Sequence, residues 1–292
     1  MPAAFLPSPA RGVWYAGPVP LRGSALCLVL GVLAALWLAS RRYRALGGRP
    51  AVILDIATLA VPAGLVGARL YGVLTRYSDY FGQGRDLTGV LRIWDGGLGL
   101  PGGLVAGGAA AWWWCRRAGI SPRPLAAAVA PALAVGHAIE VWGNWFGQSM
   151  YGPPSALPWA VEIAPEHRFT GYESFATFQP VFLYDSAWAL VVGGVVSYAI
   201  RWLLLSGDRA IALYAGLYAA GAFGAELLLI GDSARPPAAR FSEAGAVLVV
   251  VAVMVYLYLT RYRKGPDLVQ LADAGPAHVG DGAAKAVPAA GE

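Results

Sequence analysis

Apolar runs of about twenty residues recur along the chain, and they constrain its fold more than any other feature. The first, at residues 20–40, is long enough for a helix of about 31 Å, close to the thickness of a bilayer's hydrocarbon core. Charged residues make up 13% of the 292 residues, about half the share of a soluble domain. The sequence therefore predicts an all-α integral membrane protein and argues against a soluble enzyme.

The apolar runs predict seven transmembrane helices. They are expected at residues 20–40, 51–74, 96–115, 125–146, 180–205, 210–230 and 244–260. Two connections, 75–95 and 147–179, are long enough to form more than a turn, and the second could be a small lid or a solvated loop. Residues 1–264 would then be one membrane domain. Residues 265–292, rich in Ala, Gly and Pro, are expected to be a disordered tail.

The distribution of basic residues predicts the orientation. Alternate short connections on one side hold twelve Arg and Lys residues, for example Arg41, Arg42 and Arg44, whereas eight are spread over the longer connections of the other side. The positive-inside rule places the N-terminus outside and the C-terminus in the cytoplasm. The net charge of +5 comes from short clusters at the ends of apolar runs. Because these clusters form no continuous basic stripe, they argue against nucleic-acid binding.

Ionisable and amide side chains interrupt the spans at four places. They are Arg69 in the second span, His137, Glu140 and Asn144 in the fourth, Tyr184 and Asp185 in the fifth, and Glu226 in the sixth. A charge at mid-membrane costs about 2.5 kcal/mol or more, so such residues have partners or functions. One interpretation is a packing network in which Arg69 pairs with Glu226 or Asp185. The other is a polar cavity that opens toward the outer leaflet.

Glycine and cysteine carry two further predictions. The glycine-rich stretch at 96–103 lacks the Lys-Ser/Thr of a phosphate-binding loop, so close helix packing is the simpler interpretation, with a broken helix at Pro101 as the alternative. Cys27 and Cys115 fall near opposite membrane faces and are expected to be buried free thiols. No His, Cys or carboxylate cluster has metal-binding spacing, so no metal site is predicted.

Several short motifs follow one another in a fixed order along these spans. They are Gly-Ala-Arg-Leu-Tyr at 67–71, Trp-Asp-Gly-Gly-Leu at 94–98, Gly-Asn-Trp-Phe at 143–146 with Gln148 and Gly152, Leu-Pro-Trp at 157–159 with Glu162, Pro-Val-Phe-Leu-Tyr-Asp at 180–185, and Gly221, Phe223 and Glu226. Together, over about residues 12–262, they resemble the bacterial prolipoprotein diacylglyceryl transferase family, particularly its actinobacterial form.

The resemblance implies a seven-span enzyme of the cytoplasmic membrane with its active face outside. Such an enzyme moves the diacylglyceryl group of phosphatidylglycerol to the lipobox cysteine thiol in the signal peptide of a prolipoprotein, and it releases glycerol phosphate. No cofactor is implied. The implied partners are phosphatidylglycerol, the prolipoprotein and membrane lipid. The lipid-binding residues carried over from the family are Arg69, Gly143, Asn144, Gln148, Gly152 and Glu226.

The chain also departs from the family pattern. The position of the family's headgroup-binding arginine is Val141, and the glycine before it is Glu140. Other replaced family residues fall at Ser24, Pro101, Gly147, Ser149, Gln179, Ala222 and Leu229. Losing several hydrogen-bond donors to a phosphate would weaken catalysis, since one such donor can be worth about 10²- to 10³-fold in rate.

Two hypotheses from different classes follow. In the first, the chain is an active transferase whose catalytic residues are His137, Glu140 and Tyr184: His137, aided by Glu140, accepts the thiol proton, and Arg69 with Arg92 or Arg168 holds the phosphate. In the second, it is an inactive paralogue that binds lipid or preprotein and regulates an active enzyme. A transporter is disfavoured because the polar residues stop halfway along the spans.

Overall fold

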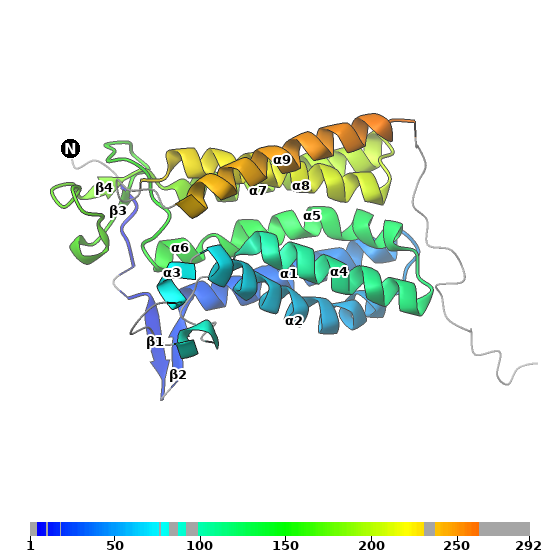
Figure 1. The fold of residues 1–292 in the computed structure, drawn as a ribbon, viewed down its shortest axis with the longest axis horizontal. Coiled ribbons are helices and arrows are strands. Elements are labelled where there is room, and N and C mark those ends of the chain that lie inside the picture. The colour runs from blue at the N-terminus through cyan, green and yellow to red at the C-terminus, as the bar shows by residue number, and fades with distance from the viewer. Residues whose placement is uncertain are drawn as a thin grey trace, which may run out of the picture.

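The computed structural model describes residues 5–9, 11–17, 19–75, 77–81, 87–91, 99–230 and 237–262. Within these ranges it is a bundle of long helices that run roughly parallel or antiparallel to the long axis (Figure 1). The long helices are α1 (Gly23–Ala45), α2 (Pro50–Thr75), α4 (Leu100–Ala118), α5 (Pro122–Glu140), α7 (Val181–Trp202), α8 (Gly207–Leu228) and α9 (Pro237–Leu259). The shorter ones are α3 (Tyr77–Tyr80), η1 (Leu87–Leu91), α6 (Gly143–Phe146) and η3 (Pro165–His167).

Each predicted span overlaps one or two of these helices, and the largest difference in bounds is at α9, which begins at Pro237 rather than at residue 244. The first helix begins at Gly23 because residues 19–22 pair in a strand. The fourth predicted span is α5 followed directly by α6, and Val141 and Trp142 between them keep right-handed helical backbone angles. Pro101 does not break a span, because it lies in the first turn of α4, where the missing N–H has no intrahelical partner to lose.

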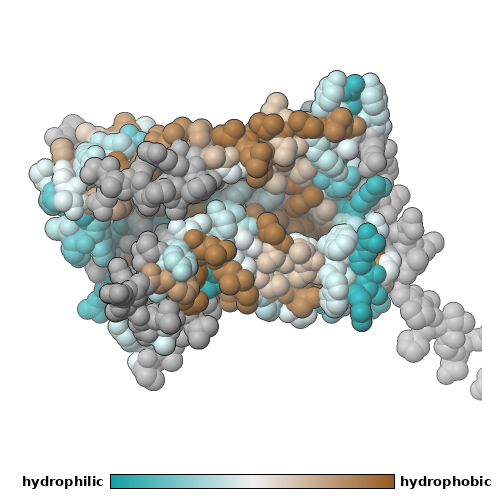
Figure 2. All heavy atoms as spheres, viewed as in Figure 1, coloured by the Kyte–Doolittle hydropathy of each residue, from teal (hydrophilic) through white to brown (hydrophobic). Residues whose placement is uncertain are grey.

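Five helical segments are long and apolar enough to cross a membrane: α1, α2, α5 with α6, α7 and α8. The described apolar part of α9, Ala244–Leu259, is shorter, and the α4 sequence is diluted by glycine and tryptophan. Large apolar side chains on the outside of the bundle, such as Leu74 and Leu248, are more than two-thirds exposed. An apolar surface of this kind requires lipid around it, and Figure 2 shows it as a brown band along the middle of the bundle.

Basic and aromatic side chains mark one end of the bundle. The connections 46–49, 119–121 and 203–206 lie there (Figure 1). Arg116 and Arg117 lie over the rings of Trp112 and Trp113, and Arg41 lies over Trp37, at 4.7 to 5.3 Å from each ring centroid. Arginine stacked on tryptophan suits a membrane–water interface. The predicted gathering of basic residues on one side is therefore present in the fold.

The helices pack in a chain of close pairs. The closest are α2 with α4, α1 with α5, α5 with α7 and α8, and α8 with α9, so α5 is the central helix. Between α2 and α4 the backbones touch at glycines: a Cβ on Gly102 would lie 2.4 Å from the Cβ of Tyr71, and one on Gly67 would lie 2.5 Å from the carbonyl oxygen of Gly102. The prediction of close packing through the glycine-rich stretch is confirmed for residues 99–103; residues 96–98 lie outside the described ranges.

The opposite end carries two small β elements. Strands β1 (Val13–Ala16) and β2 (Val19–Arg22) form an antiparallel hairpin with Val13 opposite Arg22. Residues 147–179, here called the outer cap, contain the antiparallel pair β3 (Val161–Glu162) and β4 (Thr177–Phe178). The cap has its own apolar core, which includes Tyr151 and Phe178. The segment 147–179 is thus a folded cap rather than an irregular loop.

Hydrogen bonds and charge hold the outer cap in shape. The Tyr151 hydroxyl donates to the carbonyl of His167 at 2.6 Å and accepts from the amide of Phe169 at 3.1 Å. Burial raises the pKa of Tyr151. At the cap surface, the carboxylate of Glu173 accepts the amide of Gly171, and this hydrogen bond lowers the pKa of Glu173. Of the other outer connection, 75–95, only 77–81 and 87–91 are described beyond Thr75, and the tail 265–292 lies outside the described residues.

Candidate active site between α5 and α7

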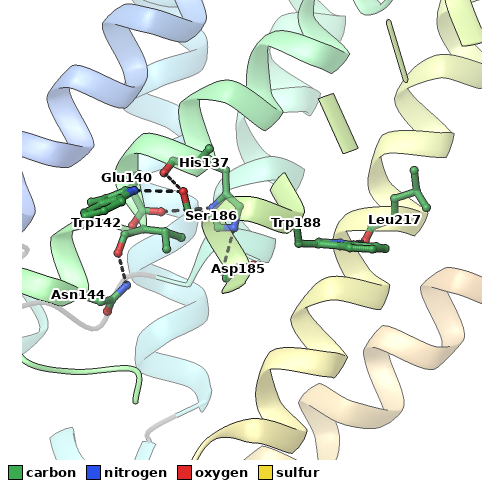
Figure 3. A network of polar contacts seen from close by, with 10 residues as sticks. His137, Glu140, Trp142, Asn144, Asp185, Ser186, Trp188 and Leu217 are labelled. Atoms are coloured by element: carbon green, nitrogen blue, oxygen red, sulfur yellow. Dashed lines mark hydrogen bonds and ion pairs between the residues drawn. The ribbon is translucent and has the colours of Figure 1, made fainter. Parts of the chain in front are cut away.

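A histidine lies between two carboxylates where α5 meets α7. The Nε2 atom of His137 lies 3.2 Å from a carboxylate oxygen of Asp185, and its Nδ1 atom lies 3.4 Å from a carboxylate oxygen of Glu140 (Figure 3). His137 and Glu140 share one face of α5 because they are three residues apart. Asp185 comes from the second turn of α7. The sequence predicted the His137–Glu140 pair but not its contact with Asp185.

The three side chains differ in exposure. Those of His137 and Asp185 are 11% and 9% exposed, whereas that of Glu140 is 39% exposed. A buried carboxylate is costly unless a positive charge or a donor faces it. Carboxylates beside both ring nitrogens would stabilise the imidazolium that forms when a neutral His137 takes up a proton. This arrangement can accept a proton and hold it, as a carboxylate-oriented histidine does in general base catalysis.

Aromatic rings and α1 enclose the cluster. The ring of Tyr218 on α8 meets the His137 ring edge-on at 5.3 Å between centroids, and Tyr214 stacks on Tyr218 at 6.2 Å. On the other side, a Cβ added to Gly31 of α1 would lie 3.4 Å from the Cβ of Glu140. Helices α1, α5, α7 and α8 therefore surround the histidine and limit its contact with water.

A serine next to Asp185 joins the two helices. The Ser186 hydroxyl donates to the carbonyl of Ala138 at 2.8 Å, and it accepts the indole N–H of Trp142 at 3.1 Å (Figure 3). Ser186 is 5% exposed. Sequence reasoning did not identify Ser186, although a serine beside an aspartate inside an apolar span is a polar signal of the same kind.

Asn144 lies on α6, one helical turn beyond Glu140 in sequence. Its side-chain amide donates to the carbonyl of Val141 at 3.0 Å. Its side-chain oxygen accepts the hydroxyl of Ser149 at 3.0 Å. Asn144 thereby shapes the turn that leads from α6 into the outer cap.

The other residues predicted around Asn144 join the membrane helices to the outer cap. A Cβ on Gly143 would lie 2.9 Å from the Cα of Ser24, so this glycine lets α6 approach α1. The side-chain oxygen of Gln148 accepts the amide of Ala164 at 2.7 Å. Gly152 donates to the carbonyl of Gln179 at 2.8 Å and lies against the carbonyl of Leu228, where α8 ends. These residues therefore position the cap over the site.

Val141, at the position of the family's headgroup arginine, is 2% exposed and packs in the apolar core of the outer cap with Tyr151 and Phe182. The apolar valine is thus integrated into the cap core.

Arg69 contacts the segment at 87–91. It is 6% exposed, and its guanidinium donates to the carbonyls of Val90 at 2.9 Å and Gly89 at 2.5 Å, with the ring of Tyr80 beneath it. Its described hydrogen bonds therefore go to backbone carbonyls rather than to Glu226 or Asp185. Arg168 likewise donates to the carbonyls of the cap residues Ile163 and Glu173. Arg92 lies outside the described residues.

The remaining predicted residues lie beside the cluster or farther along α8. The hydroxyl of Tyr184 accepts the indole N–H of Trp159 at 3.1 Å, which connects the outer cap to the start of α7 next to Asp185. Glu226 lies near the end of α8, two helical turns beyond Tyr218 in sequence. Cys27 and Cys115 are both buried and form no disulfide, as predicted.

The amino-acid sequence matches a known family. The model of the family described as prolipoprotein diacylglyceryl transferase matches residues 11–262. The chain belongs to this family. It is 42% identical to the phosphatidylglycerol–prolipoprotein diacylglyceryl transferase of Streptomyces avermitilis over 285 residues, which cover 97% of this chain and 82% of that protein.

Other members of the transferase family show the same relation. The Streptomyces coelicolor protein named phosphatidylglycerol–prolipoprotein diacylglyceryl transferase 1 is 43% identical over 272 residues, covering 92% of this chain and 78% of its own length. The Corynebacterium efficiens transferase is 38% identical over 277 residues, covering 91% and 86%. The actinobacterial resemblance seen in the motifs is thereby confirmed, and the chain is a multi-pass membrane protein of a transferase family.

Proposed function

We propose that this chain transfers the diacylglyceryl group of phosphatidylglycerol to the lipobox cysteine thiol of a prolipoprotein, at the outer face of the cytoplasmic membrane. Family membership and relatives at 38–43% identity that carry this name support the reaction. The contact of His137 with Asp185 and Glu140 is the observation that carries its chemistry.

The proposed reaction exchanges one bond to glycerol carbon for another. The cysteine sulfur attacks the carbon of the diacylglyceryl group that is bonded to a phosphate oxygen. A C–S bond forms and this C–O bond breaks, so that glycerol phosphate leaves with the bonding electrons. The thiol must lose its proton because the thiolate is the nucleophile. His137 accepts this proton, and Asp185 and Glu140 stabilise the imidazolium that results. Glu140, as the most exposed of the three, faces the substrate side.

The proposed topology completes this function. Seven spans with the N-terminus outside put the outer cap and the α5–α7 site at the outer face, and the basic end in the cytoplasm. We propose that Arg69, Gly143, Asn144, Gln148, Gly152, Tyr184 and Glu226 form or support the lipid site. Residues 1–264 then act as one membrane domain with a C-terminal tail.

A second candidate function has an observation in its favour. Val141 is buried in the cap core, and Glu140 beside it is an exposed carboxylate that would repel a lipid phosphate while it is ionised. A chain that retains the scaffold but not the phosphate site could bind lipid or preprotein and regulate an active transferase.

The test is a transfer assay with the purified full chain in vesicles that contain phosphatidylglycerol, with a lipobox peptide as acceptor. Peptide lipidation is followed by mass and glycerol phosphate release is measured in parallel. The transferase proposal expects both products from the wild type and a loss of about 100-fold or more in His137→Gln. His167→Gln, the same change at an exposed cap position, is the matched control and should leave the rate unchanged.

The same assay separates the two candidate functions. Lipid and peptide binding without any transfer by the wild type would favour the regulatory function. Transfer that appears only in a Glu140→Gly/Val141→Arg double variant would show that the chemistry was lost by replacement of the phosphate-binding residue. Equal rates for the wild type and His137→Gln would reject His137 as the proton acceptor.

A further inference from the structure

Small side chains form part of the contact between α5 and α7. The buried face of α5 includes Ala130, Ala134 and Ala138, and that of α7 includes Ala189 and Gly193. A Cβ on Gly193 would lie 3.3 Å from the Cβ of Ala134, so the backbones are already close. Small residues allow helices to approach, and the larger side chains of Val192 and Val196 on α7 pack in one apolar cluster with Ala130 and Ala134.

The position of α7 along α5 nevertheless decides whether the histidine meets its carboxylate. His137 belongs to α5 and Asp185 to α7, and their contact is 3.2 Å long. A shift of about 1 Å along the line that joins the two atoms would lengthen the contact beyond hydrogen-bonding distance. Such displacements of a catalytic group can cost about 100-fold in rate.

Ser186 supplies the polar contact that fixes this position. Where α5 ends, the backbone amide of Trp142 donates to the carbonyl of Ile139 rather than to that of Ala138. The carbonyl of Ala138 accepts the hydroxyl of Ser186. The indole of Trp142 then donates to the same hydroxyl. The hydroxyl therefore makes one bond as donor and one as acceptor, both to α5 or the turn that follows it, and it is adjacent in sequence to Asp185.

We propose that Ser186 is a positioning residue for the transfer reaction: by holding α7 on the end of α5, it keeps Asp185 against His137. This inference rests on the proposed function only for its effect on rate. The geometric part concerns His137 and Asp185 alone, and it can be measured in a protein that carries out no transfer.

The first test observes His137 directly. The chain has three histidines, so the ring nitrogens of isotope-labelled histidine give few signals, and His137→Gln identifies the one from His137. Ser186→Ala should shift this signal at constant pH, and Ser186→Thr, which keeps the hydroxyl, should restore it. The matched control is Ser206→Ala, because Ser206 is a similarly buried serine, 8% exposed, at the opposite end of the bundle. An unchanged His137 signal in Ser186→Ala would overturn the proposal.

The second test uses transfer kinetics. Ser186→Ala should lower kcat about 10- to 100-fold with little change in the KM for lipid, whereas Ser206→Ala should not. In a His137→Gln background, Ser186→Ala should cause no further loss, because the hydroxyl acts through the histidine. Losses that multiply in the double variant would assign Ser186 a general structural role.

The two measurements keep this proposal separate from the proposed function. If the wild type shows no transfer but the His137 signal responds to Ser186→Ala, the reaction is wrong and the positioning is right. If transfer occurs and depends on His137 but neither test responds to Ser186→Ala, the positioning is wrong and the reaction is right.

Discussion

The helix pairs α2–α4 and α5–α7 are held together by different kinds of contact. Glycines let the backbones of α2 and α4 touch, as at Gly67 and Gly102, so these two helices pack closely along their length. Between α5 and α7 the contact is completed by polar atoms of Ser186, His137 and Asp185. Van der Waals packing suffices where only structure is needed. Polar contacts, which cost more to bury in a membrane, occur where chemistry is proposed.

The largest effect is expected from a variant that disrupts the contact between His137 and Asp185. Asp185→Asn keeps the side-chain shape but removes the charge that stabilises a protonated His137, so transfer should fall about 10²- to 10³-fold. The melting temperature should change little, because the amide can still occupy the same space. The assay compares peptide lipidation rates and thermal unfolding. A large loss of stability with the rate per folded molecule intact would reverse the interpretation of this interface.

The next largest effect is expected from a variant that disrupts the glycine contact between α2 and α4. In Gly102→Val, the new side chain would meet the backbone of Gly67 and the Cβ of Tyr71, and overpacking of this kind costs about 1–3 kcal/mol. Unfolding in detergent should show the lower stability, whereas the rate per folded molecule should stay near that of the wild type. Gly108→Val, on the same helix but with nothing within 4 Å of its Cβ, is the control.

A third variant lies in the outer cap, outside the helix pairs α2–α4 and α5–α7. Tyr151→Phe removes the hydrogen bond to His167 and leaves the amide of Phe169 without its acceptor, so the cap should lose about 1–2 kcal/mol. Burial raises the pKa of Tyr151, so its contribution is complete below the ordinary tyrosine pKa of about 10 and is lost as pH rises through the raised pKa. Hydrogen exchange of cap amides across this pH range should show the loss in the wild type but not in Tyr151→Phe.

The smallest effect is expected from a variant that tests which hydrogen bond of Ser186 positions α7. Trp142→Phe removes the indole donor to Ser186 but leaves the bond from Ser186 to Ala138 in place. The rate should fall only about 2- to 5-fold, less than in Ser186→Ala, because the direct link between α7 and α5 remains. A loss larger than that of Ser186→Ala would assign the main positioning role to the indole.

Part of the candidate site could be predicted because it depends on neighbours along one helix. His137 and Glu140 are three residues apart, and helical geometry alone places them on one face. The hydrogen bond of Asn144 to Ser149 joins α6 to the outer cap and is not visible in helical spacing. The approach of Gly143 to Ser24 on α1 is likewise a contact between segments far apart in the chain.

The partners of charged residues could not be predicted for the same reason. The cost of burial signals that Arg69 and Asp185 need partners, but it does not say which. Arg69 donates to carbonyls at 89 and 90, and Asp185 meets His137, which depends on how two helices slide along each other. The family resemblance did identify the position of Val141, whereas its burial in the cap core appears only in the packed structure.

The sequence by itself determined the membrane-embedded helical class, the approximate helix positions, the glycine-rich packing stretch and the family. These follow from local hydropathy, spacing and motifs, which act over one or two helical turns. The tertiary structure alone decided that Asp185 contacts His137, that Ser186 joins α7 to α5, and that Val141 belongs to the cap core. Those contacts depend on the relative positions of separate helices, which are set by packing over the whole bundle.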